Sequence, residues 1–137
     1  FFIYRINMIK GSCCCGVIKF EISTVPDMMG TCHCSRCRKL GSSTIVFIKK
    51  ESFNLIQGKE FIEIYKPESP FSYVRTFCRK CGTALGEIGS ESESFPVPVN
   101  CLDDDPGLRN QFHVFVSSKP VWYEIADSAP QYQENPA

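Results

Sequence analysis

Nine cysteines in tight groups are the feature of this 137-residue sequence that most limits its fold. They are Cys13, Cys14, Cys15, Cys32, Cys34, Cys37, Cys78, Cys81 and Cys101. Cysteines one or two residues apart rarely form a disulfide, which needs Cα atoms about 5.5 Å apart with converging Cβ vectors. A short turn can instead direct two thiolates at one metal ion about 2.3 Å away. The odd count also argues against a disulfide framework. The pattern therefore predicts bound zinc, with an iron–sulfur cluster as the main alternative.

Composition excludes several other classes of protein. Lys plus Arg and Asp plus Glu both total 15, and no long basic run is present, so we expect no nucleic-acid partner. No segment reaches the roughly 18 apolar residues that a membrane helix requires. The apolar residues 1–7 lack a small-residue cleavage site behind them, so we expect no secretory signal. These features, with many free thiols, predict a cytoplasmic protein.

Short apolar and β-branched runs between turn-rich loops predict an all-β domain. The expected strands cover residues 17–22, 44–48, 61–65, 73–77, 84–88, 97–101, 113–116 and 122–125. The length fits one domain, which would be marginally stable without a covalent or metal staple. We expect an N-terminal extension over 1–10, a zinc-binding domain over 11–128, and a loosely ordered tail over 129–137.

Two of the cysteine motifs together make one complete metal site. Cys13 and Cys15 precede an expected strand, and Cys78 and Cys81 lie between two expected strands. Each motif ends in a glycine, which accepts the positive φ of a tight turn. Four thiolates brought together by strand pairing would form a closed, tetrahedral structural site.

The remaining motif predicts a second and different site. Cys32, Cys34 and Cys37 lie within six residues, so one loop would supply three thiolates to one ion. Three protein ligands with a fourth position open to water or substrate are typical of catalytic zinc. Nearby basic side chains would offset the negative charge of three thiolates and attract an anionic thiol. These are Arg36, Arg38 and Lys39.

The order of these motifs resembles the glutathione-dependent formaldehyde-activating enzyme family, which also includes centromere protein V. The resemblance covers roughly residues 11 to 126. It rests on Gly11-Ser12-Cys13-x-Cys15-Gly16, Cys32-His33-Cys34-Ser35-x-Cys37-Arg38-Lys39, Phe77-Cys78-x-x-Cys81-Gly82, the run from His113 to Lys119, and Trp122-Tyr123-Glu124-Ile125.

The resemblance implies a β-tent fold of short antiparallel sheets that holds two zinc ions per chain. Its structural zinc would be bound by Cys13, Cys15, Cys78 and Cys81, and its catalytic zinc by Cys32, Cys34 and Cys37. The implied activity is that of a carbon–sulfur lyase acting on a small thiol adduct, such as glutathione plus formaldehyde giving S-hydroxymethylglutathione. The alternative is a non-catalytic zinc module that binds a partner or a small thiol. The oligomeric state stays open.

Several conspicuous residues are expected to lie outside both sites. Cys14 should point away from the ion that its neighbours bind, and so should His33. Cys101 is expected to be a buried, unligated cysteine in a strand. If Cys101 instead completed the second site, the catalytic interpretation would weaken. His113 is expected to pack or hydrogen-bond, and Trp122 to lie in the core.

Overall fold

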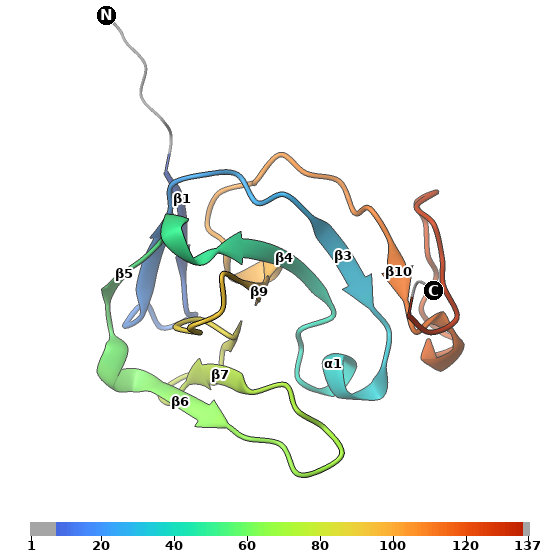
Figure 1. The fold of residues 1–137 in the computed structure, drawn as a ribbon, viewed down its shortest axis with the longest axis horizontal. Coiled ribbons are helices and arrows are strands. Elements are labelled where there is room, and N and C mark those ends of the chain that lie inside the picture. Colours follow the sequence, from blue (N-terminus) through green and yellow to red (C-terminus); the bar gives the residue numbers. More distant parts are fainter. Residues whose placement is uncertain (1–7, 136–137) are drawn as a thin grey trace, which may run out of the picture.

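The computed structural model describes residues 8–135, which form three short sheets (Figure 1). The first contains β1 (Ile9–Ser12), β2 (Lys19–Ile22) and β5 (Phe53–Gln57), in that order. The second has the order β10 (His113–Val114), β3 (Met29–Cys32), β4 (Thr44–Lys49) and β9 (Ser94–Pro98). The third contains β6 (Ile62–Tyr65), β7 (Arg75–Cys78) and β8 (Ala84–Gly86). Neighbouring strands are antiparallel except for β10 and β3, which are parallel. The predicted all-β fold of short sheets is confirmed.

Helical structure is limited to short pieces. Within the described part, the one α-helix is α1 (Ser35–Lys39), which lies between β3 and β4. The 3₁₀ turns cover Lys50–Ser52, Lys59–Phe61, Val99–Cys101 and Val116–Ser118. No helix of residues 8–135 has the length and apolar character needed to cross a bilayer.

The core contains buried side chains from all three sheets. In the β4–β9 pair, Val46 lies opposite Val97 and Ile48 lies opposite Phe95, and all four side chains are buried. The Phe53 ring connects this pair to the first sheet, because its centroid lies 5.4 Å from the ring of Phe95 and 5.4 Å from that of Phe20. Alternation of buried and more exposed residues along β2 and β4 explains why these strands could be predicted. The strand predicted at 97–101 is wrong for its last three residues, which form a 3₁₀ turn after β9.

Two strands were not predicted because a glycine occupies a position that an aromatic ring covers. A Cβ atom at Gly11 of β1 would overlap the ring of Phe20, and one at Gly30 of β3 would overlap the ring of Phe112. A glycine in a strand marks such a close approach and breaks the apolar alternation that sequence analysis relies on. β5 was also missed.

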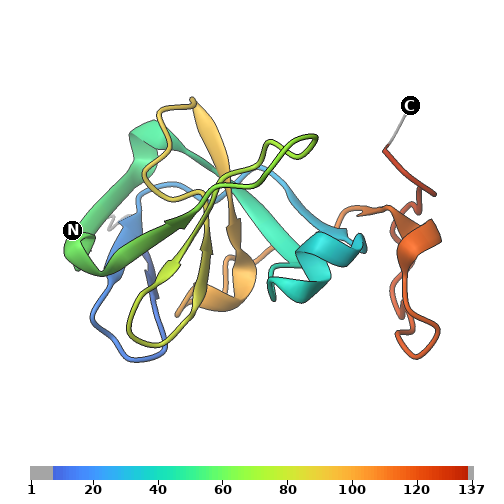
Figure 2. The same ribbon diagram turned by 90° about the horizontal axis from the view of Figure 1, so that it is seen from below.

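The C-terminal part differs from expectation in two ways. The strand predicted at 122–125 is wrong, because this segment is an exposed loop in which Trp122 is 76% accessible. The loosely ordered tail is also wrong for residues 130–134, which run alongside β10. The His113 N–H donates to the Pro130 carbonyl, and the Tyr132 N–H donates back to the His113 carbonyl, both at 2.9 Å. Figures 1 and 2 show this segment on the α1 side of the molecule.

The described residues also bear on the expected N-terminal extension over 1–10. Residues 1–7 lie outside the described part, while Ile9 and Lys10 belong to β1 and pair with Ile22 and Glu21 of β2.

We expect Gly86→Ala to lower the free energy of unfolding by about 2–4 kcal/mol, because it combines backbone strain with a steric clash. Gly86 has φ +67°, and a Cβ there would overlap the Pro96 carbonyl oxygen of β9. Gly89→Ala is the matched control, because its φ is +83° but nothing lies within 4 Å, so strain of about 1–2 kcal/mol remains. Urea unfolding measures both, and equal losses would contradict the close packing of β8 on β9.

Candidate metal centres

The first site lies where two hairpin turns meet. Cys13 and Cys15 lie in the turn between β1 and β2, while Cys78 ends β7 and Cys81 lies in the turn that leads to β8. The four sulfur atoms lie within 4.8 Å of one another. The Sγ atoms of Cys13 and Cys15 are 3.7 Å apart, and those of Cys15 and Cys78 are 3.9 Å apart. Four sulfurs at about 2.3 Å from a tetrahedral zinc would be separated by about 3.8 Å, so the arrangement fits that ion.

Backbone amides support these sulfurs as they do in metal-binding turns. The Ile18 N–H donates to the Cys13 Sγ, and the Lys80 N–H donates to the Cys78 Sγ, both at 3.3 Å. The Thr83 hydroxyl lies 3.1 Å from the Cys81 Sγ and lowers the pKa of that thiol, to about 5. Donors directed at sulfur stabilise thiolates, which are the form that binds metal.

The two turns come from different sheets, so direct strand pairing does not bring the four cysteines together as we expected. One cross-connection is the Cys14 N–H, which donates to the Thr83 Oγ1 at 2.8 Å. Gly16 and Gly82 both have φ +82°, which allows each chain to turn sharply after its last cysteine. The Cys14 side chain is exposed and lies outside the sulfur cluster.

The second cluster is built on the junction of β3 and α1. Cys32 ends β3, Cys34 is the N-cap of α1, and Cys37 lies within the helix. Their sulfurs lie within 4.8 Å of one another, and no fourth His, Cys, Asp or Glu of residues 8–135 joins the group. The Cys37 N–H donates to the Cys34 Sγ at 3.3 Å. The geometry therefore offers three ligands on one short loop. The assignment of all seven cysteines as zinc ligands remains a prediction.

A cation from a distant strand contacts this second cluster. The Arg75 guanidinium of β7 donates to the Cys37 Sγ at 3.5 Å. A hydrogen bond from Cys32 and this contact with Arg75 lower the pKa of Cys37, to about 5, against the opposing effect of burial. The hydrogen bond to Cys37 and burial raise the pKa of Cys32. No sequence motif predicts this contact, because Arg75 is 38 residues from Cys37.

The nearby basic residues expected to offset the thiolate charge are partly engaged elsewhere. The Arg36 guanidinium donates to the Tyr65 hydroxyl at 3.1 Å and lies 3.8 Å from the centre of the Phe71 ring. Arg38 and Lys39 are exposed. Among the described residues, Arg75 is therefore the cation that donates a hydrogen bond to a sulfur of this cluster.

Cys101 lies in neither cluster. It is buried as predicted, but in the 3₁₀ turn Val99–Cys101 rather than in a strand. Its thiol donates to the Pro98 carbonyl at 3.1 Å, and burial raises its pKa to about 12. A thiol in this environment stays protonated and behaves as a small apolar side chain.

His33 points away from the sulfur cluster into a network of side chains in which His33 and His113 are buried. Its Nε2 lies 2.8 Å from the Nδ1 of His113, and the Nε2 of His113 lies 3.0 Å from a carboxylate oxygen of Asp127. Because a carboxylate only accepts, His113 donates to Asp127 from Nε2. The Tyr123 ring packs on the His33 ring, and the two ring centroids are 5.3 Å apart. The segment after β10 therefore braces the loop that carries the three cysteines.

The chain is similar to known proteins in both sequence and fold. A profile of the family described as glutathione-dependent formaldehyde-activating enzyme matches residues 8–118, which include all seven clustered cysteines. A crystal structure of a Rhodobacter sphaeroides protein is similar, with a TM-score of 0.58 and 25% sequence identity. The match covers 70% of this chain and 89% of that chain.

Asp127→Ala should loosen the second cluster by removing the carboxylate that orients His113. We expect about tenfold faster metal release from Cys32, Cys34 and Cys37, with release from the four-cysteine site unchanged. Competition with a chromogenic chelator resolves the two phases. Asp105→Ala is the matched control. The Asp105 carboxylate accepts a hydrogen bond from the Gly107 N–H, as the Asp127 carboxylate does from the Ala129 N–H, but Asp105 has no hydrogen bond to a histidine. Equal effects of the two substitutions would contradict the bracing role.

Cys101→Ser should leave the number of bound metal ions unchanged, because its thiol is buried against a carbonyl outside both clusters. Cys37→Ser should lower the number bound by removing one of three ligands. Native mass spectrometry counts the ions directly. Loss of an ion in Cys101→Ser would identify Cys101 as a ligand.

Proposed function

The chain belongs to the glutathione-dependent formaldehyde-activating enzyme family, and we propose that it is a zinc-dependent carbon–sulfur lyase. The proposed reaction joins a small thiol to formaldehyde, or separates the adduct, at the site of Cys32, Cys34 and Cys37. The observation that carries the proposal is the three-sulfur cluster itself, because no fourth protein ligand from the described residues joins it. A site of this kind leaves a position for substrate.

The other four cysteines would hold a second zinc with a structural role. The near-tetrahedral spacing of their sulfurs supports this assignment. A closed four-thiolate site leaves no position for substrate, and its binding free energy, about 10 kcal/mol or more, is also folding free energy. We therefore assign stability to the first site and chemistry to the second.

The proposed chemistry needs a thiolate at neutral pH, since the thiolate and not the thiol is the nucleophile. A zinc ion at the second site would supply Lewis acidity that lowers the pKa of an incoming thiol. Arg75, beside Cys37, would offset the negative charge of the crowded sulfurs. The substrate sulfur forms a bond to the formaldehyde carbon, the carbonyl π electrons move to oxygen, and that oxygen takes a proton from water. The reverse reaction breaks the carbon–sulfur bond.

The family description makes glutathione the first thiol to test. The free cysteines of the described chain also suit a reducing compartment, and we propose a cytoplasmic location on that ground.

The proposal predicts two zinc ions per chain, and faster loss of the ion at Cys32, Cys34 and Cys37 to a chelator. Native mass spectrometry should find both ions, and exchange NMR should show adduct exchange between glutathione and formaldehyde above the uncatalysed rate. Cys37→Ser should lower the catalysed rate by about 100-fold, whereas Cys14→Ser, whose side chain lies outside the cluster, should not change it.

A fully loaded protein with no rate above background would sink the lyase proposal and favour a zinc module that only binds thiols. A single ion per chain, or a disulfide among Cys32, Cys34 and Cys37, would have the same consequence for the lyase.

A further inference from the structure

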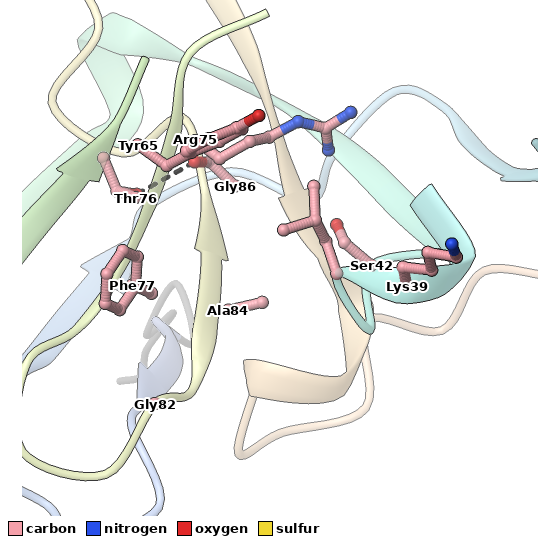
Figure 3. Close-up of a pocket in the computed structure, with 10 residues that line it drawn as sticks. Lys39, Ser42, Tyr65, Arg75, Thr76, Phe77, Gly82, Ala84 and Gly86 are labelled. Atoms are coloured by element: carbon pink, nitrogen blue, oxygen red, sulfur yellow. Dashed lines mark hydrogen bonds between the residues drawn. The ribbon is translucent and has the colours of Figure 1, made fainter. Parts of the chain in front are cut away.

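A cavity of about 350 Å³ lies beside the second cysteine cluster. Its walls come from the end of α1 with the loop that follows, and from the third sheet, as Figure 3 shows. Arg75 is part of the wall and also contacts the Cys37 Sγ at 3.5 Å, so one side chain connects the cavity to the cluster. The volume lies in the range of pockets that bind small molecules.

Ser42 gives this cavity an unused hydrogen-bonding group. Its side chain is 3% exposed, and its Oγ is the one buried side-chain nitrogen or oxygen of the described residues without a hydrogen-bond partner. Its backbone N–H donates to the Cys37 carbonyl at 2.9 Å, which ties its position to the metal-binding loop. Buried polar groups are nearly always paired in folded proteins, so an unpaired hydroxyl in a cavity wall indicates a missing partner.

The charge of the cavity wall is positive. Arg75 and Lys39 both line it, and neither forms an ion pair with a carboxylate among residues 8–135. Burial raises the pKa of Glu87, and the positive charge of Arg75 partly opposes this increase. Glu87 does not line the cavity. The lining residues thus include two cations, an unpaired hydroxyl and the Tyr65 side chain, but no acidic residue.

We propose that this cavity binds the carboxylate of the thiol substrate, with Ser42 donating a hydrogen bond and Arg75 and Lys39 supplying positive charge. The inference rests on the proposed function, because it assumes that the thiol occupies the neighbouring three-cysteine site. A carboxylate only accepts hydrogen bonds, and its bonds with charged donors are about twice as strong as neutral ones. The substrate class is therefore a thiol with a carboxylate on a short chain, either as a simple mercapto acid or as part of a cysteine-containing peptide.

The test compares two thiols that differ in one group. Cobalt-loaded protein, with two ions per chain, is titrated with 3-mercaptopropanoate and with 3-mercaptopropanamide while the thiolate-to-cobalt absorption is recorded. We expect the carboxylate thiol to bind about tenfold more tightly. Ser42→Ala and Lys39→Gln should each reduce this preference to about threefold or less. Lys59→Gln, an exposed lysine outside the cavity, is the matched control and should keep the full preference.

The outcomes separate this inference from the proposed function. Equal affinities for the two thiols, or a preference that survives in both Ser42→Ala and Lys39→Gln, would overturn the carboxylate site and leave the lyase proposal standing. Binding of neither thiol would overturn both. Because Lys39 is exposed, its substitution keeps the test decisive even if Ser42→Ala fails to load metal. Glutathione and its diethyl ester, titrated in the same way, distinguish a peptide carboxylate from that of a simple mercapto acid.

Discussion

The fold depends on the meeting of two hairpin turns at four sulfur atoms. β1–β2 and β7–β8 belong to different sheets, and each sheet is only three strands wide. Short sheets expose much of their surface, so a chain of this size gains from a strong local attachment between them. The apolar core joins the first and second sheets through Phe20, Phe53 and Phe95. The sulfur cluster lies where a turn of the first sheet meets a turn of the third.

The two clusters are supported by different kinds of interaction. Backbone amides within a few residues support Cys13 and Cys78, so the first cluster is held by its own turns. The second cluster depends on side chains from elsewhere: Arg75 from β7 contacts Cys37, and His113 reaches the loop through His33. A locally held site is rigid, whereas a site held by several elements can have its charge and shape adjusted by each of them.

Much of this could be predicted from the sequence, for identifiable reasons. Cysteine spacing within a turn limits where sulfurs can point, so the grouping of Cys32, Cys34 and Cys37 follows from covalent geometry. Strands with apolar alternation, such as β2 and β4, were predicted, while β1 and β3 were hidden by glycines beneath aromatic rings. The contacts of Arg75 and Asp127 could not be predicted, because they join residues 38 and 14 positions apart with no shared motif. Ser42 could not be predicted either, because its buried hydroxyl is notable only for lacking a hydrogen-bond partner in the folded structure.

The pairing of residues 130–134 with β10 has a consequence for the order in which the protein matures. All four cysteines of the first cluster have been synthesised once residue 81 has emerged, so this cluster can form early. The three cysteines of the second cluster emerge even sooner, but their supports at His113 and Asp127 emerge only after Cys81. Domains generally fold as their segments emerge from the N-terminus onward. The contacts that support the second cluster are therefore completed only after all four cysteines of the first cluster have emerged.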